Sequence, residues 1–272
     1  MNRTEVLPGV WHLEEDYRVY CTLVQGKTLA LLWDTGQGRT DLAAYVAQQV
    51  PTPCLVLNSH GHSDHIGGNF RFPQVYAHRA DWPLLAAYAR LTGRETPVCP
   101  LEPGQSFALG GRRAEVISLA GHTKGSVGLL LAGEGLLLAG DGLNQTLLLL
   151  GAEAAPLSQL RQTLEAVLRL PFAHYLSSHA PHPLPKAQVA VHLHHLDRLP
   201  PRPLRPPGLP EPVPGTGQAV GAAHRPGIGR GGGVLTLKKG PMPFVAWGQK
   251  HKNSGYSAWN THCNKFDRST PL

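Results

Sequence analysis

The run HGHSDH at residues 60–65 constrains this chain more than any other stretch of its sequence. It places three imidazoles and one carboxylate within six residues, directly after the mostly apolar run 53–59. Side chains at the end of a strand and in the tight loop beyond it can converge on one point. Neutral imidazole nitrogens and carboxylate oxygens are the ligands that a borderline metal such as Zn²⁺ prefers. We therefore expect a strand that ends in a metal-binding loop, rather than a polar loop facing solvent.

The net charge of +7 is concentrated at the C-terminal end of the chain. From residue 200 onward, ten basic residues are opposed by only two acidic ones. The first 199 residues hold 15 basic and 16 acidic side chains, a net charge of −1. This part of the chain is electrostatically neutral and shows no basic stripe, so we expect a small-molecule substrate and no nucleic-acid partner.

Membrane and redox signals are consistent with a cytoplasmic protein. Apolar runs are interrupted well before the roughly 18 residues that a membrane span needs, so no membrane partner is expected. The N-terminal stretch lacks the apolar segment of a secretory signal. Cys21 and Cys54 lie in strand-like apolar runs without CxxC pairing, which is typical of small buried residues in a reducing compartment. Oligomeric state is not indicated by the sequence.

Apolar runs of strand length and of helix length alternate through the first 199 residues. The expected strands lie at residues 9–14, 19–26, 28–36, 53–59, 75–77, 106–111, 112–121, 126–133, 135–141 and 174–179. The expected helices lie at residues 42–50, with Thr40 as the expected cap, and at 81–91, 156–170 and 186–199.

This order of elements predicts an α/β (α+β) fold. Meandering strands mixed with helices that can cover outer faces indicate two mixed β-sheets packed together with helices outside, in four layers. Each sheet would be buried on both faces, which explains why its strands lack a clean alternation of polar and apolar residues.

Composition changes sharply after Leu199, so we divide the chain into a domain at 1–199 and a tail at 200–272. The tail begins with the proline-rich run PPRPLRPPGLPEPVPG and continues through a glycine-rich segment. Such a segment buries too little apolar surface to offset its conformational entropy. We expect a basic tail of low order, and a replaced C-terminus is a further hypothesis.

Three more candidate ligands each follow an apolar strand. His122 lies in AGHTKGS, Asp141 in LLLAGDG and His179 in YLSSHAP. A lone histidine in a turn is usually solvated, and an aspartate before glycine usually makes a turn. Taken together with the HGHSDH loop, the three residues instead predict a site gathered at one rim of the sheets.

These residues are the basis of a family resemblance. The sequence resembles the metallo-β-lactamase superfamily, whose signature is HxHxDH followed by a separate His, a bridging Asp and a last His. The resemblance extends over roughly residues 1–199 and includes WDTG at Asp34. It implies an αββα sandwich with the site at one edge of the two sheets.

The resemblance also implies a ligand set for two divalent ions, with Zn²⁺ expected and Fe or Mn as alternatives. The first ion would be held by His60, His62 and His122. The second would be held by Asp64, His65 and His179, with Asp141 bridging both. Asp64 would also be the catalytic residue that orients the nucleophile and then transfers its proton.

Asp141 favours the glyoxalase II-like branch of dinuclear metallohydrolases, because true β-lactamases of this fold typically lack a bridging carboxylate there. The implied reaction is attack by a bridging hydroxide on an ester, thioester, lactone or phosphodiester of a small molecule. Persulfide dioxygenases share the motif with one iron, and a form with a replaced C-terminus could bind metal without catalysis. These two alternatives stay open.

Several other polar residues near the motifs are weaker candidates. A solvated position is the better expectation for Lys124 and for His182. Positions 192, 194 and 195 do not share one helix face, so these histidines are expected mostly at the surface.

Overall fold

The computed structural model describes residues 1–149 and 151–198, in which the chain forms two β-sheets. The strands of the first sheet, in order across it, are β1 (Asn2–Leu7), β2 (Val10–Asp16), β3 (Val19–Gln25), β4 (Ala30–Trp33), β5 (Cys54–Leu57), β6 (Val75–Ala77) and β7 (Val98–Pro100). Those of the second are β13 (Leu184–Pro185), β12 (His174–Ser177), β11 (Leu136–Gly140), β10 (Val127–Leu131), β9 (Arg113–Ser118) and β8 (Ser106–Ala108).

Both sheets mix parallel and antiparallel neighbours. In the first sheet β4 to β7 run parallel, whereas β1 to β4 form antiparallel pairs. In the second sheet only β11 and β12 run parallel. Parallel neighbours matter for the site, because their carboxyl ends leave the sheet at the same edge.

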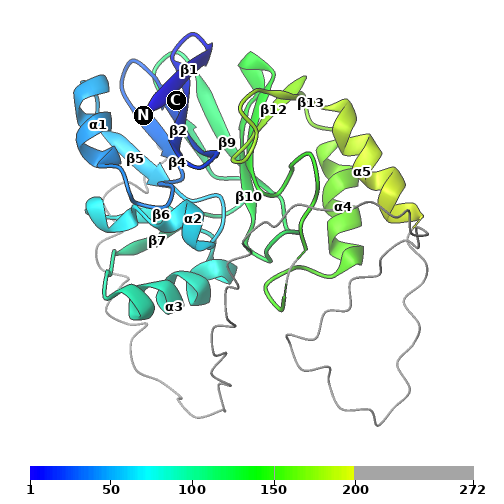
Figure 1. Cartoon of the computed structure of the whole chain (residues 1–272). Coiled ribbons are helices and arrows are strands. Elements are labelled where there is room, and N and C mark those ends of the chain that lie inside the picture. The colour runs from blue at the N-terminus through cyan, green and yellow to red at the C-terminus, as the bar shows by residue number, and fades with distance from the viewer. Residues whose placement is uncertain (150, 199–272) are drawn as a thin grey trace, which may run out of the picture. The chain divides into compact units, whose positions relative to one another are not determined.

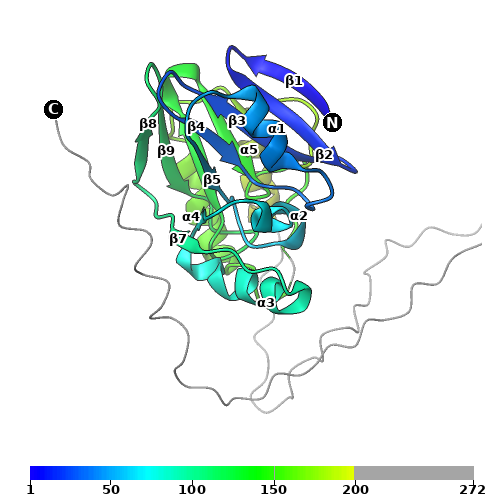
Figure 2. The same ribbon diagram turned by 90° about the vertical axis from the view of Figure 1, so that its left-hand side faces the viewer.

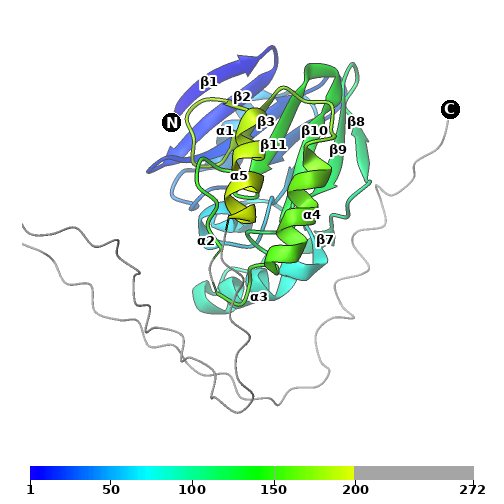
Figure 3. The same cartoon turned by 90° about the vertical axis from the view of Figure 1, so that its right-hand side faces the viewer.

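Helices cover the outer faces of the two sheets. They are α1 (Leu42–Gln49), α2 (Ser63–Ile66), α3 (Trp82–Thr92), α4 (Leu157–Val167) and α5 (Ala187–Asp197). Figure 1 shows α1 and α3 on the side of the first sheet and α4 and α5 on the side of the second. Figure 2 shows α1 in front of the first sheet and α3 below its strands, and Figure 3 shows α4 and α5 in front of the second sheet. The expected αββα sandwich is confirmed.

Three apolar clusters fill the three interfaces between these four layers. Leu31 and Leu129 belong to the cluster between the sheets. Their chain neighbours point the other way: Leu32 packs toward α1 and α3, and Leu130 packs toward α4 and α5. Successive side chains of a strand point to opposite faces, so a strand buried on both faces must be apolar throughout. This packing confirms the expected reason for the uninterrupted apolar runs.

The structure corrects one predicted helix cap. Helix α1 is capped by Asp41, whose carboxylate accepts a hydrogen bond from the backbone N–H of Ala44 at 3.1 Å, and not by Thr40. Thr40 is engaged elsewhere, because its backbone N–H and its hydroxyl both donate to Glu15. The buried Glu15 therefore fixes the chain before the helix, and the cap shifts by one residue.

Three strands are absent from the sequence prediction. Residues 2–5 of β1 are exposed, and β7 and β13 are only three and two residues long. An apolar pattern needs a longer, half-buried run to be visible in sequence. The predicted tail at 200–272 lies outside the described residues.

The structure also bears on the cysteines and on membrane-spanning helices. Cys21 is buried with a free thiol, as expected, and Cys54 is free and half-buried. Among the residues that the structure describes, no helix is long and apolar enough to cross a membrane.

Candidate metal centre

The HGHSDH loop follows the end of β5, as predicted, and β5 lies between β4 and β6 in the interior of the first sheet. The one-turn helix α2 begins at Ser63 and holds Asp64 and His65 on consecutive positions. The loop then returns through Gly67, whose ideal Cβ would lie 2.4 Å from the backbone carbonyl carbon of Gln37. Only glycine permits this close approach of two backbones, which places the loop against the segment that precedes α1.

The second sheet supplies the other three side chains. Asp141 directly follows β11 and His179 follows β12, and these two strands are parallel neighbours. Both residues therefore leave the sheet at the same edge. His122 lies in the loop between β9 and β10. The structure brings all seven predicted side chains together, four from one half of the chain and three from the other.

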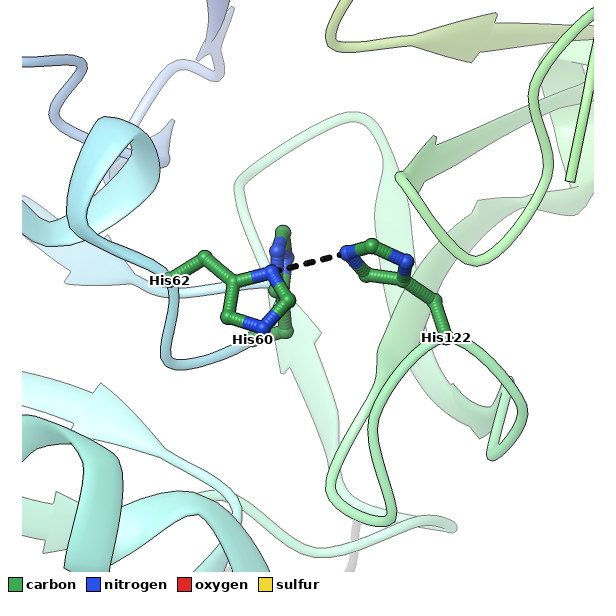
Figure 4. A group of neighbouring side chains, drawn as sticks. All are labelled: His60, His62 and His122. Atoms are coloured by element: carbon green, nitrogen blue, oxygen red, sulfur yellow. Dashed lines mark hydrogen bonds between the residues drawn. The ribbon is translucent and has the colours of Figure 1, made fainter. Parts of the chain in front are cut away.

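One group contains three imidazoles. The ligand nitrogens of His60, His62 and His122 lie within 4.8 Å of one another. Figure 4 shows the three rings turned toward a common point, with His122 Nε2 at 2.9 Å from His62 Nδ1. The ring centroids are 4.6 to 4.7 Å apart, so the imidazoles form a nearly equilateral arrangement.

A second group contains a carboxylate and two imidazoles. Ligand atoms of Asp64, His65 and His179 also lie within 4.8 Å of one another. Asp64 Oδ2 is 3.5 Å from His65 Nε2 and 3.4 Å from His179 Nε2. The Asp64 side chain keeps 35% of its surface exposed and that of Asp141 only 8%, so solvent reaches Asp64 more easily of these two carboxylates.

Asp141 lies between the two groups. Its Oδ2 atom is 3.7 Å from His122 Nε2 in the first group. The same oxygen is 3.7 Å from His65 Nε2 and 3.1 Å from His179 Nε2 in the second. One carboxylate oxygen therefore faces ligand atoms of both groups, which is the position that a bridging ligand needs.

The side chains present fit divalent ions. Among the described residues, His60 Nε2, His65 Nε2 and Asp141 Oδ1 are buried polar atoms without a hydrogen-bond partner. Burying an unpaired polar atom costs free energy, and a coordinated cation removes that cost. Imidazole nitrogen and carboxylate oxygen are also the donors expected for zinc and neighbouring transition metals. The assignment of these seven residues as ligands stays a prediction.

Backbone carbonyls orient two of the imidazoles. His122 Nδ1 lies 2.6 Å from the carbonyl oxygen of Leu148, and His179 Nδ1 lies 3.2 Å from that of Arg18. When a carbonyl accepts from Nδ1–H, the unprotonated Nε2 is left free to bind a cation. Both carbonyls thus select the tautomer that the site requires.

Asp34 orients a third imidazole. Its Oδ2 atom lies 3.0 Å from His65 Nδ1 and also accepts from the hydroxyls of Ser59 and Ser178. Its Oδ1 atom accepts from the Ser59 backbone N–H at 2.7 Å. The WDTG motif marked Asp34 in the sequence without assigning it a role. In the structure it supports His65 from behind the site.

The charges within the site alter its protonation in the absence of metal. Burial lowers the pKa of His60 well below its usual value, and the neighbouring imidazoles act in the same direction. Burial also opposes the charged form of His65, but Asp141 and Asp34 together hold its pKa well above normal. Hydrogen bonds with Asp141 and Asp64 raise the pKa of His179 to about 9. The carboxylates therefore stabilise positive charge in the second group, either as protons on His65 and His179 or as a bound cation.

The weaker candidates lie mostly where they were predicted. The exposed ones are Lys124, His182, His194 and His195. His192 contradicts its prediction, because it is buried and its Nε2 lies 2.6 Å from the carbonyl oxygen of Asn144. The inner face of α5 holds this ring beneath the loop that follows Asp141, where it packs rather than binds.

Comparison with known protein families identifies the family to which this fold and site belong. The model of the metallo-beta-lactamase superfamily matches residues 15–179. The chain belongs to this superfamily, and the resemblance inferred from its motifs is confirmed.

Curated relatives with similar sequences are named hydroxyacylglutathione hydrolase or acyl-coenzyme A thioesterase. A hydroxyacylglutathione hydrolase from Synechococcus sp. is 30% identical over 125 residues, which cover 46% of this chain and 45% of the relative. One from Gloeobacter violaceus is 36% identical over 127 residues, covering 44% and 46%. An acyl-coenzyme A thioesterase from Gallus gallus is 27% identical over 158 residues, covering 44% and 57%. The chain spans about half the length of the curated relatives it matches.

Solved structures of similar fold support the architecture. A metallo-beta-lactamase from Pontibacter korlensis superposes with a TM-score of 0.58 at 23% identity, covering 73% of this chain and 99% of the other. A metallo-beta-lactamase family protein from Thermus thermophilus superposes with a TM-score of 0.57 at 24% identity, covering 71% and 81%. At this identity the likeness concerns the fold.

Proposed function

We propose that this chain is a dinuclear metal-dependent hydrolase that cleaves a thioester of a small molecule. The observation that carries the proposal is the position of Asp141, whose Oδ2 atom faces Nε2 of His122 in one group and of His65 in the other. This arrangement supports two ions, with Zn²⁺ the expected metal for imidazole and carboxylate donors. Superfamily membership supports metal-dependent hydrolysis as the general activity.

The seven residues would have two roles, binding the metal ions and transferring a proton. His60, His62 and His122 would hold one ion, Asp64, His65 and His179 the other, and Asp141 would contact both. Bound there, two divalent ions supply Lewis acidity, which lowers the pKa of a water molecule and polarises an acyl carbonyl. The partly exposed Asp64 carboxylate would orient the attacking water and accept its proton. That proton could then pass to the departing thiolate.

The thioester class is supported by what the relatives have in common. Hydroxyacylglutathione and acyl-coenzyme A differ in their thiol carrier but share the acyl–sulfur bond. We propose that shared bond as the reactive group, rather than either carrier. The near-zero net charge of residues 1–199 supports a small molecule in preference to a nucleic acid.

Metal analysis combined with a substrate panel tests the proposal. The full chain, stripped of metal and reloaded with Zn²⁺, should bind two ions and hydrolyse thioesters of glutathione or coenzyme A. We expect kcat/KM for a thioester to exceed that for oxygen esters, lactones and phosphodiesters by about tenfold, or about 1.4 kcal/mol. The same chain reloaded with Fe²⁺ tests the iron-dependent alternative, which oxygen consumption with a glutathione persulfide, in place of thioester hydrolysis, would support.

Substitutions locate the activity in the site. His62→Gln and Asp64→Asn should each abolish turnover without changing the circular dichroism spectrum or the unfolding midpoint by much. The matched control is His194→Gln, because His194 is an exposed histidine outside the seven residues. Activity retained in both His62→Gln and Asp64→Asn would refute the site.

A further inference from the structure

Asp81 occupies the N-cap position of α3 but does not cap that helix. The residue ends a short 3₁₀ turn, Arg79–Asp81, and its side chain makes no capping hydrogen bond. An aspartate at this position normally accepts from the first turn of its helix. The Asp81 side chain is instead buried, with a relative exposure of 1% for the residue. A buried carboxylate must find its hydrogen bonds elsewhere.

Those hydrogen bonds go to two different loops. Asp81 Oδ2 accepts from the backbone N–H of Gly61 at 2.8 Å and from the hydroxyl of Thr123 at 2.7 Å. Asp81 Oδ1 accepts from the backbone N–H of Gly125 at 2.9 Å. The first loop leaves the first sheet, and the second loop joins β9 to β10 in the second sheet. One carboxylate therefore connects loops that belong to opposite sheets.

The contact points are the residues next to the three-imidazole group. Gly61 lies between His60 and His62, and Thr123 directly follows His122. Asp81 therefore binds both loops next to the point where His62 Nδ1 and His122 Nε2 lie 2.9 Å apart. None of its partners is a predicted ligand, so the carboxylate contacts the chain beside the imidazoles and not their donor atoms.

The glycines at both ends show that this connection is close. An ideal Cβ at Gly125 would lie 2.5 Å from Asp81 Oδ1. A Cβ at Gly61 would lie 2.7 Å from the Cβ of Leu84, on the first turn of α3. Both distances are shorter than atoms can approach without movement, so a side chain at either glycine would push its loop away from Asp81 and α3. Asp34, by comparison, contacts His65 in the second group directly.

We propose that Asp81 is a positioning residue that sets the distance between His60, His62 and His122, and thereby the affinity of the first ion alone. The proposal rests on the ligand assignment in the proposed function. Supporting groups behind metal ligands are worth about 10- to 100-fold in affinity, and we expect Asp81→Asn to cost that amount at one site. Asn keeps the volume of Asp but turns an amide donor toward the N–H and O–H donors.

Zn²⁺ affinity, measured by competition with a chromophoric chelator, tests the proposal site by site. His179→Gln weakens the second group and His62→Gln the first, so each background isolates one site. Asp81→Asn should weaken Zn²⁺ binding about 10- to 100-fold with His179→Gln, but by less than about threefold with His62→Gln. Asp34→Asn, the comparison variant, removes the carboxylate in contact with His65 and should weaken Zn²⁺ binding with His62→Gln, where Asp81→Asn has little effect. Equal weakening in both backgrounds, or none with His179→Gln, would overturn the proposal.

Thr123 provides an independent test if Asp81→Asn does not fold. Thr123→Val removes one of the three hydrogen bonds and should weaken the first site severalfold, whereas Thr123→Ser should restore wild-type affinity. Equal affinities for the valine and serine variants would contradict the proposed connection. An unsubstituted chain that binds no Zn²⁺ would instead defeat the proposed function. Two bound ions with no site-selective effect of Asp81 would defeat this inference alone.

Discussion

Asp34 Oδ2 lies 3.0 Å from His65 Nδ1, and both side chains are completely buried. His65 is a predicted metal ligand, and Asp34 supports its ring from the protein interior. Ser59 and Ser178 donate further hydrogen bonds to the same carboxylate. Removing one partner of a buried charged pair leaves the other without compensation. The relationship therefore affects stability as well as the site.

Asp34→Asn should lower the free energy of unfolding of the metal-free chain by about 3 kcal/mol or more, because it removes the charge opposite His65. Asn is the suitable replacement, since Asp34 has a φ of 64° and Asn tolerates this left-handed region. Urea unfolding provides the measurement. Ser178→Ala, which removes one of several donors to the same carboxylate, should cost only about 1.5 kcal/mol. Equal losses in the two variants would contradict this account.

His12 should make stability depend on pH. Burial lowers its pKa to about 4, although the carbonyl of Ala180 acts in the opposite direction. The unfolded chain therefore binds a proton below the ordinary pKa of 6.5 while the folded chain does not. Stability should fall as pH decreases from 6.5 toward 4, by about 2 kcal/mol at pH 5 from this residue.

Urea unfolding of the metal-free chain at pH 7 and pH 5 checks the His12 prediction. The difference between the two pH values should shrink by about 2 kcal/mol in His12→Gln, which cannot titrate. The comparison isolates His12, because the other histidines are common to both proteins. An unchanged pH dependence in His12→Gln would show that His12 is not the source.

Gly38 should tolerate no side chain. It has a φ of +76°, and an ideal Cβ there would lie 2.3 Å from the carbonyl oxygen of Gly67. Gly93 is the matched control, because its φ is +68° but nothing lies within 4 Å of its Cβ position. Gly93→Ala should cost about 1 kcal/mol from backbone strain alone. Gly38→Ala should cost at least about 2 kcal/mol more in urea unfolding, since two backbones must separate.

Asp141→Asn should weaken both predicted metal positions together. Its Oδ2 atom faces Nε2 of His122 on one side and of His65 and His179 on the other. At limiting free Zn²⁺ the metal content should fall from two ions per chain to one or fewer, as measured by elemental analysis after dialysis. Glu165→Gln, an exposed carboxylate on α4, should leave the content unchanged. Two tightly held ions in Asp141→Asn would remove the bridging role.

Much of the fold was predictable because both sheets are buried on both faces. Long apolar runs mark such strands even without alternation, and each of them ends in a glycine or polar turn. The ends of the apolar runs also showed where the strands end, so His122, Asp141 and His179 could be expected at one rim of the sheets. The edge strands β1, β7 and β13 escaped prediction, since exposed or very short strands leave no apolar pattern.

The supporting residues of the site were not predictable from one sequence. Asp81 reads as the first residue of a helix, and only the fold shows that its carboxylate turns away from that helix toward two loops. His192 reads as one of three surface histidines, yet the packing of α5 buries it against Asn144. In both cases the contact joins segments twenty or more residues apart, which local spacing does not encode.

The division of the seven side chains between the sheets has a consequence for how the chain holds together. The first sheet uses residues 2–100 and the second uses residues 106–185, so each sheet is one continuous half of the chain. An ion held by the predicted ligands would contact residues of both halves, so it would bind fully only after the halves have docked. Its binding free energy would then oppose their separation. The apolar cluster between the sheets holds the two halves together without metal, and bound ions would add to that stability and to resistance to proteolysis.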